Sequence, residues 1–305
     1  MTVATCHRRP DCDRVIATFD SRLAVTQRLS IIIPTTRDDQ ALESGLVSVL
    51  EHRPAASEVL VVLNRAYADP YELKDEVRFV QAPRGAGLFE CLNVGALHAQ
   101  GEVFHFLGCG LEARPHWAEA ALAHFSDPQV GAVVPSLVEL DDANCVLAQG
   151  LEYDPAGRAS LHLPEPRSRS SRSLLAGPLA VAGFYRAAAI GPGFNPNLGL
   201  QLAEVDLALR LEHEGFRIAV EPDSRIGVEP SLLESPLPSF RQGREAESLY
   251  WRYRQSLARQ ASLASHMATV IAEAMGSFPR WRSPAQLAGR LVGACQGILQ
   301  RRVAA

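Results

Sequence analysis

The stretch HFLGCGLEA, residues 105–113, contains the side chains that most directly raise a question of chemistry. An apolar run breaks there into Gly108, Cys109 and Gly110, and the acid Glu112 follows. In α/β enzymes the carboxyl end of such a strand opens into a loop that holds ligands. A thiolate suits soft metal ions better than Mg²⁺ or Mn²⁺, and no charged side chain adjoins Cys109 in sequence to activate it as a nucleophile. We therefore expect Cys109 to be a small buried or loop residue.

A second candidate is the segment Gly85-Ala86-Gly87, which follows Arg84 and opens a predicted helix that contains Asn93. Backbone amides at a helix N-terminus, together with the helix dipole, bind phosphate groups well. The same glycines are equally consistent with a simple turn. The sequence leaves both interpretations open.

Two further groups of residues are candidates for binding. Cys6, His7 and Cys12 contain metal-ligating atoms, but no second Cys or His pair lies within reach, so an irregular N-terminal extension over residues 1–27 is the better interpretation. The polar segment 164–173, PEPRSRSSRS, is either a solvated linker or a loop whose cations clamp a diphosphate or an acidic acceptor. Those cations are Arg167, Arg169 and Arg172.

Apolar patterning predicts the elements that position these residues. Short apolar runs closed by Pro, Asn or Gly indicate buried parallel strands, and a period of 3.6 residues indicates helices. Gly101 is expected to end the second helix in the left-handed conformation. The predicted order is strand 29–34, helix 38–52, strand 58–64, strand 77–83, helix 87–101 and strand 102–107. This order implies a three-layer α/β fold with a mostly parallel sheet.

The second half of the chain is less regular. We expect a helix at 116–125, a strand at 131–140, a strand and then a helix within 178–194, an amphipathic helix at 204–216, a strand at 217–222 and helices thereafter. The chain thus divides into an α/β domain over residues 28–235 and a helical region over 236–305.

An apolar stripe beside arginines marks the last predicted helices. It either packs against the main domain or lies on an anionic membrane surface. Its residues are Leu287, Leu291 and Ile298, with the neighbouring Arg290, Arg301 and Arg302.

The bulk composition is that of an ordinary soluble protein. The 305 residues are 47% hydrophobic and carry a net charge of −4, which argues against a general nucleic-acid binder. Six cysteines without a CxxC pair suggest reduced thiols. The start of the chain lacks the apolar core of a signal peptide, and no run of eighteen apolar residues indicates a membrane span. We expect a cytoplasmic protein with no nucleic-acid partner and at most peripheral membrane contact.

Four segments, in this order and spacing, resemble the family 2 glycosyltransferases, whose catalytic domain has the GT-A fold. The segments are SIIIPTT (30–36), EVLVVLN (58–64), NVGALHAQGEVFHFL (93–107) with RPHW (114–117), and GFYRAAAIGPGFNPNLGLQLAEVDLALRLEHEGFRI (183–218). The resemblance covers about Leu29 to Ile226. It implies a nucleotide-sugar donor bound by Pro34, Thr35, Asn64, Arg84, Gly85, Asn93, Gly108, Cys109 and Gly110.

The chain departs from the family where metal binding is expected. In the family, the fourth strand ends in an Asp-x-Asp type motif whose carboxylates hold a divalent cation against the donor's diphosphate. Residues 108–110 stand there instead, and the acid that typically ends the second strand is replaced by Leu63. Val228 or Glu229 replaces the family's metal-binding histidine, so Glu112 and Glu229 are the remaining oxygen donors. The usual ligands of Mg²⁺ or Mn²⁺ are therefore absent, and we predict no conventional metal site, which leaves open a Mg²⁺ or Mn²⁺ ion held by other oxygens.

The family's catalytic base corresponds to Glu204, with Asp206 two residues later. A carboxylate there would take the proton from an acceptor hydroxyl as it attacks the anomeric carbon, with inversion of configuration. The residues alone also allow a structural interpretation. Acids in the first turn of a helix complement its dipole, and Asp206 with Arg210 forms an i,i+4 pair.

Two functions are consistent with this pattern. The first is a glycosyltransferase that moves a sugar from a nucleotide-sugar donor to a hydroxyl of a saccharide, lipid or protein, with cationic or backbone groups in place of the metal. The second is a GT-A-like domain that has lost the reaction and binds a sugar, a nucleotide or a partner protein. An unrelated nucleotide-binding fold would need a GxGxxG or P-loop pattern, and none follows a predicted strand.

Overall fold

The computed structural model describes residues 28–154, 157–163, 174–233, 239–257, 262–276 and 283–304. Several candidates lie outside these residues: the N-terminal extension with Cys6, His7 and Cys12, and the arginines Arg167, Arg169 and Arg172.

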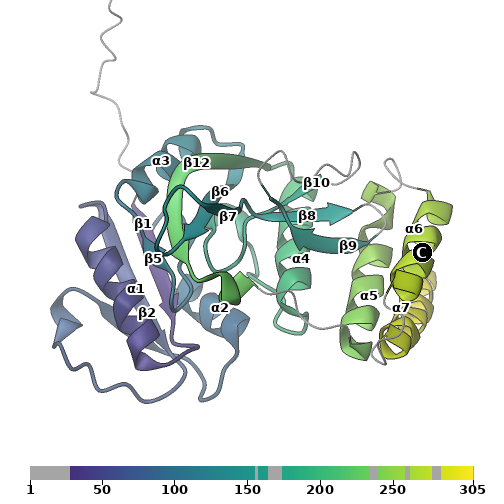
Figure 1. Ribbon diagram of the computed structural model, residues 1–305, viewed down its shortest axis with the longest axis horizontal. Coiled ribbons are helices and arrows are strands. Elements are labelled where there is room, and N and C mark those ends of the chain that lie inside the picture. Colours follow the sequence, from purple (N-terminus) through teal and green to yellow (C-terminus); the bar gives the residue numbers. More distant parts are fainter. Residues whose placement is uncertain are drawn as a thin grey trace, which may run out of the picture.

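A mostly parallel sheet forms the centre of the molecule (Figure 1). Its order is β3-β2-β1-β4-β11-β6-β12-β5, with β7 paired to β6. Strands β1 to β4 run parallel, β6 and β12 are parallel to each other, and β11 is antiparallel to both of its neighbours. The strands are β1 (Leu29–Pro34), β2 (Ser57–Leu63), β3 (Arg78–Gln81), β4 (Val103–Phe106), β5 (Glu112–Ala113), β6 (Val130–Glu139), β7 (Val146–Ala148), β11 (Phe184–Arg186) and β12 (Arg217–Val228).

Helices cover both faces of this sheet, which confirms the three-layer α/β prediction. Alternate residues of β1 show the division: Ile31 and Ile33 pack with α1, whereas Ile32 packs with α2. Because both faces are covered, β1 is buried along its whole length. The helices are α1 (Asp39–His52), α2 (Leu88–His98), α3 (Trp117–Ala123), α4 (Leu200–His213), α5 (Phe240–Leu257), α6 (Leu263–Gly276) and α7 (Ser283–Ala304).

A second, antiparallel sheet has the order β10-β8-β9 and packs beside α4. Its strands are β8 (Leu151–Asp154), β9 (Arg158–Leu161) and β10 (Leu174–Gly177). The sequence analysis did not predict this sheet. Short strands of this kind have too few residues to display a clear period.

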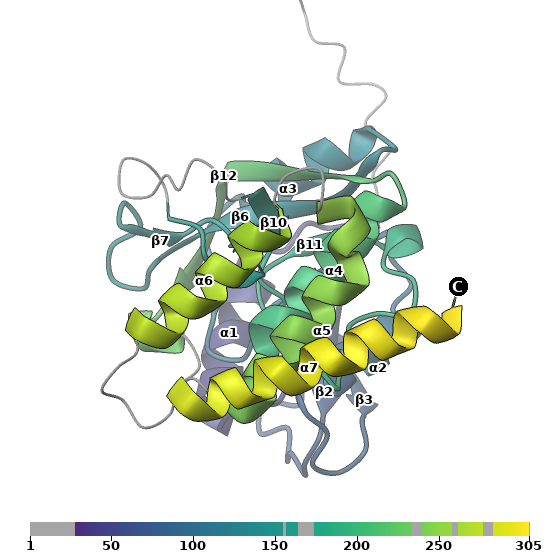
Figure 2. The same cartoon turned by 90° about the vertical axis from the view of Figure 1, so that its right-hand side faces the viewer.

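The three C-terminal helices form the end of the molecule beyond α4, with α6 and α7 outermost (Figure 2). Three glycines of α7, at positions 289, 293 and 297, face α5 closely enough that a side-chain carbon would collide with it. Helix α7 therefore packs on α5 through its glycines, whereas Leu291 of the predicted stripe is exposed. Arg290, one of the arginines beside the stripe, is buried and pairs with Glu247, which agrees with the packing alternative at this position. None of the described helices is long and apolar enough to cross a membrane.

Parts of the two outer helices remain uncovered. Leu287 is half-buried, and the side chains of Ile298, Arg301 and Arg302 lie outside the described residues. The exposed large apolar side chains on these two helices are Leu263, Met267, Ile271, Leu291 and Val292. Peripheral membrane contact stays a prediction, as do the domain boundaries at residues 28, 235 and 236.

Two details of the helix prediction are wrong. Helix α2 ends at His98, and Gly101 does not have a left-handed backbone. A side-chain carbon on Gly101 would lie 2.6 Å from Ser30 Oγ, so glycine is needed there for close packing. Helix α4 begins at Leu200, four residues before the predicted start, so Glu204 is not in its first turn.

Candidate active site

The ends of β1 and β2 bring two predicted donor-binding residues together. Thr35 Oγ1 donates a hydrogen bond to the Val62 carbonyl at 3.1 Å and accepts one from the Asn64 N–H at 3.1 Å. Asn64 Nδ2 donates to the Ala86 carbonyl at 2.9 Å, and Gly85 N donates to the Asn64 carbonyl at 2.9 Å. Thr35, Asn64 and Gly85 therefore form one hydrogen-bonded group at the carboxyl edge of the sheet, beside the end of β1 at Pro34.

The amides of residues 85–87 already have acceptors, which argues against the phosphate-binding interpretation. Gly85 N donates to Asn64, Ala86 N to the Pro83 carbonyl at 2.9 Å, and Gly87 N to Glu90 Oε2 at 2.8 Å. Gly85 has φ +77°, a conformation that favours glycine. The segment thus shapes a turn, while the Arg84 side chain is exposed beside it.

Asn93 has a structural partner on another segment. Its Nδ2 donates to the Phe194 carbonyl at 2.8 Å and its Oδ1 accepts from the Phe194 N–H at 2.8 Å. Both ends of the amide are therefore engaged. This geometry does not support a role for Asn93 in donor binding.

The Gly-Cys-Gly turn is closed by a neighbouring loop. Gly108 N donates to the Val181 carbonyl at 2.7 Å, and a side-chain carbon on Gly108 would lie only 2.8 Å from Val181 Cβ. Cys109 is 4% exposed, and burial raises the pKa of its thiol to about 11. The thiol is therefore protonated at neutral pH, in agreement with the expected role as a small buried residue.

Glu204 lies beneath the same loop. Its side chain is 3% exposed, and Oε1 accepts a hydrogen bond from Ala180 N at 2.6 Å. Oε2 is buried and has no hydrogen-bond partner among the described residues. Burial raises the pKa of the carboxyl to about 8, and the hydrogen bond from Ala180 opposes this only in part. The loop thus joins the end of β4, through Val181, to the Glu204 carboxyl, through Ala180.

Asp206 faces a different part of the molecule. Its Oδ1 accepts hydrogen bonds from Arg252 Nη1 at 3.0 Å and from the Tyr253 hydroxyl at 3.0 Å, both on α5. The predicted pair with Arg210 is wrong, because Arg210 Nη2 donates to the Gly193 carbonyl at 2.5 Å. Asp206 therefore joins α4 to α5 and does not share a site with Glu204.

Comparison with known proteins agrees with this arrangement of elements. Residues 30–164 match the model of Glycosyl transferase family 2. This match confirms the family 2 resemblance over somewhat less than half of the chain.

A curated relative is similar over a part of this chain. It is a polypeptide N-acetylgalactosaminyltransferase 12 of Mus musculus, 32% identical over 104 residues, which are 31% of this chain and 18% of the relative. The chain thus matches less than a fifth of the length of that relative.

Solved structures of glycosyltransferases share the fold. GalNAc-T7 with UDP, GalNAc and Mn²⁺ aligns with a TM-score of 0.55 at 14% identity, over 83% of this chain and 58% of its own. TarS of S. aureus gives 0.52 at 12% identity over 92% of each chain. The mannosyltransferase PcManGT of Pyrobaculum calidifontis, with GDP-Man and Mn²⁺, gives 0.50 at 17% identity over 90% of this chain and 88% of its own. These similarities confirm the GT-A fold.

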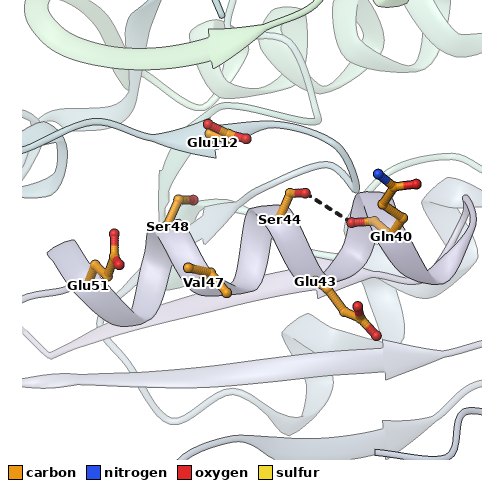
Figure 3. Close-up of a pocket in the computed structure, with 7 residues that line it drawn as sticks. All are labelled: Gln40, Glu43, Ser44, Val47, Ser48, Glu51 and Glu112. Atoms are coloured by element: carbon orange, nitrogen blue, oxygen red, sulfur yellow. Dashed lines mark hydrogen bonds between the residues drawn. The ribbon is translucent and has the colours of Figure 1, made fainter. Parts of the chain in front are cut away.

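The family 2 cation site has no match in the side chains at the end of β4. Gly108 and Gly110 offer no ligand, and the Cys109 thiol is buried. Glu112 lies instead over α1, in an open groove of about 420 Å³ that Glu43 and Glu51 also line (Figure 3). Within the described ranges no group of three or more His, Cys, Asp and Glu side chains could hold a metal ion. The residues present at the end of β4 do not fit a divalent cation.

Glu229, the other remaining oxygen donor, is exposed after β12 and accepts a hydrogen bond from Ser231 Oγ at 3.3 Å.

Sequence reasoning missed the loop 179–183, which joins β4 to Glu204. That segment, LAVAG, consists of apolar residues and glycine, and its contribution is made by backbone atoms. No signal of residue type could have identified it.

Proposed function

We propose that the protein is a glycosyltransferase that moves a sugar from a nucleotide-sugar donor to a hydroxyl acceptor, with Glu204 as the base. The observation that supports this most is the loop 179–183, which holds the Glu204 carboxyl close to the end of β4, while Oε2 has no hydrogen-bond partner in the described part of the chain. By resemblance to family 2, that strand end is on the donor side, and Glu204, which lies beyond the matched residues 30–164, is on the acceptor side.

The proposed step is a direct displacement. The acceptor oxygen forms a bond to the anomeric carbon, the bond from that carbon to the diphosphate oxygen breaks, and the hydroxyl proton passes to the Glu204 carboxylate. Attack from the side opposite the leaving group inverts the configuration. A pKa of about 8 suits a base that works near neutral pH, because the carboxylate is then basic enough to accept the proton.

The donor class follows from two fold relatives. One was solved with UDP and GalNAc and the other with GDP-Man, so we propose a nucleoside diphosphate sugar here. Both also contain Mn²⁺, but the side chains at the end of β4 do not fit such a cation in this chain. We therefore propose metal-independent transfer, by a cytoplasmic protein, to an acceptor that is a saccharide, a lipid or a protein.

One observation favours a second candidate, a domain that binds a nucleotide or sugar without turnover. Glu204 is 3% exposed, so loop 179–183 must shift before an acceptor reaches the carboxyl. If loop 179–183 stays closed, the donor can still bind, but no acceptor reaches Glu204 and no sugar is transferred.

The deciding experiment compares Glu204→Gln with Glu214→Gln, an exposed position at the end of the same helix. Gln keeps the shape of Glu and can still accept from Ala180, so both variants should fold. We expect Glu204→Gln to lower turnover of UDP- or GDP-sugars by about 100-fold or more, with Glu214→Gln unchanged. Nucleotide binding by the wild type without turnover of any donor would favour the binding domain instead.

A further inference from the structure

Three arginines follow three adjacent parallel strands. Arg84 comes three residues after β3, Arg65 two residues after β2, and Arg37 three residues after β1. The order β3-β2-β1-β4 places these arginines in a row that continues to the turn 108–110 after β4. The carboxyl edge of this part of the sheet is therefore cationic.

Arg37 is the member of this row that reaches the turn. A side-chain carbon on Gly110 would lie 3.8 Å from Arg37 Cδ. Gly110 is one of the two positions where the family's Asp-x-Asp motif would place a carboxylate. A cationic side chain thus lies against the place where the family holds a cation.

The charge of Arg37 is not compensated by its acidic neighbours in sequence. Asp38 accepts the Ala41 N–H at 2.8 Å and so caps α1. Asp39 pairs with Arg65, whose Nη2 also donates to the Arg37 carbonyl at 3.0 Å. In the part of the chain that the structure describes, no carboxylate pairs with the exposed Arg37 guanidinium.

We propose that Arg37 binds the diphosphate of the nucleotide donor, in the place where a divalent cation would otherwise lie. The inference rests on the proposed function and names the group that replaces the metal. A guanidinium presents two parallel N–H donors that match two phosphate oxygens. Its fixed positive charge also stabilises the negative charge that develops on the leaving diphosphate.

The glycine at position 110 agrees with this assignment. A carboxylate there would pair with Arg37 and cancel its charge, whereas glycine leaves the guanidinium free to bind an anion. The backbone of Gly110 also has φ +90°, which disfavours any other residue. The free guanidinium of Arg37 therefore depends on the absence of an acid at position 110.

The test is calorimetric titration of the full-length protein with UDP, UMP, GDP and GMP, in EDTA and in Mn²⁺. Arg37→Gln is compared with Arg37→Lys and with Arg78→Gln. Arg78 is the control for loss of a surface arginine: it is exposed at the first residue of β3, on the opposite edge of the same sheet, where it contacts Glu58 and the His98 carbonyl. We expect the wild type to bind a nucleoside diphosphate in EDTA. Arg37→Gln should weaken that binding about tenfold or more and reduce the preference for diphosphate over monophosphate, while Arg78→Gln leaves both unchanged.

Each other outcome overturns a different statement. Wild-type binding that requires Mn²⁺ would overturn the arginine assignment and leave the glycosyltransferase proposal standing, as would unchanged binding by Arg37→Gln. Failure of the wild type to bind any of the nucleotides in either condition would count against the proposed function itself.

Discussion

The contact between Gly108 and Val181 shows that an acid of the Asp-x-Asp type at position 108 is excluded by packing. Because a side-chain carbon on Gly108 would lie 2.8 Å from Val181 Cβ, an aspartate there would require loop 179–183 to move. The same loop carries the amide of Ala180 that holds Glu204. The absence of an acid at position 108 and the position of the candidate base are therefore linked through one loop.

The raised pKa of Glu204 predicts how activity depends on pH. A base works only when it is deprotonated, so kcat/KM should rise with pH through about 8 and then level off. An unperturbed carboxyl, with an ordinary value of 4.5, would give a rate that is flat across this range. The measurement is a pH–rate profile between about pH 5.5 and 9.5. A profile without an inflection near 8 would show that Glu204 is not the base or is not buried in the active form.

Sequence reasoning grouped some site residues correctly and misassigned others. The family 2 resemblance assigned Thr35 and Asn64 to one donor-binding group, and the two residues are hydrogen-bonded to each other. Sequence reasoning could not foresee that Asp206 joins α5, because Arg252 and Tyr253 lie 46 and 47 residues further along the chain. Partners at that separation leave no local pattern.

At the scale of elements, continuous apolar strands were the easiest to predict. The bounds of β1 agree with the prediction, and those of β2 differ by one residue at each end. The start of α4 was missed because its N-cap, Gly199, has no capping side chain. The carboxylate of Glu245 on α5 accepts the Gly199 N–H at 2.7 Å instead. This cap comes from 46 residues away, so the usual sequence signal for a helix start is absent.

The contact between α5 and α7 allows a prediction at this scale. A side-chain carbon on Gly293 would lie 2.9 Å from Glu247 Cβ and would collide with the Arg244 carbonyl. Gly293→Ala should therefore lower the free energy of unfolding by about 1–3 kcal/mol, although alanine is the better helix former. Urea denaturation measures this, with Ala288→Leu on the exposed face of α7 as the control. A variant as stable as the wild type would mean that α7 packs differently.

At the scale of the whole molecule, hydrophobic periodicity alone could not predict the order and direction of the strands. Strand β11 is inserted antiparallel between β4 and β6, and no feature of its three residues, FYR, indicates that direction. The resemblance to family 2 implied the GT-A fold. It therefore implied an arrangement of strands that periodicity did not predict. The small sheet β10-β8-β9 was missed altogether, although it lies beside the helix that carries Glu204.

A buried charged group joins the C-terminal helices to one another. Glu247 on α5 accepts hydrogen bonds from His266 on α6 at 2.9 Å, from Arg290 on α7 at 3.3 Å and from Trp251 at 2.9 Å. Burial alone would raise the pKa of the Glu247 carboxyl, but the hydrogen bond and charge of His266, followed by Arg290 and Trp251, hold it below the ordinary value of 4.5. The ionised form is therefore the one that stabilises the packing of α5, α6 and α7.

The hydrogen bonds and charges around Glu247 predict how the stability of the folded protein depends on acid pH. A carboxyl whose folded pKa is lowered contributes its full stability above the unfolded value of 4.5 and loses it as the pH falls further, through the folded pKa. Glu247→Gln should lower the free energy of unfolding by about 3 kcal/mol at neutral pH, and the difference from the wild type should shrink below pH 4.5. Urea denaturation at about pH 7 and pH 3.5 measures both effects, with Glu119→Gln on the exposed side of α3 as the control. A difference that stays constant down to the lower pH would show that the Glu247 charge does not hold these helices together.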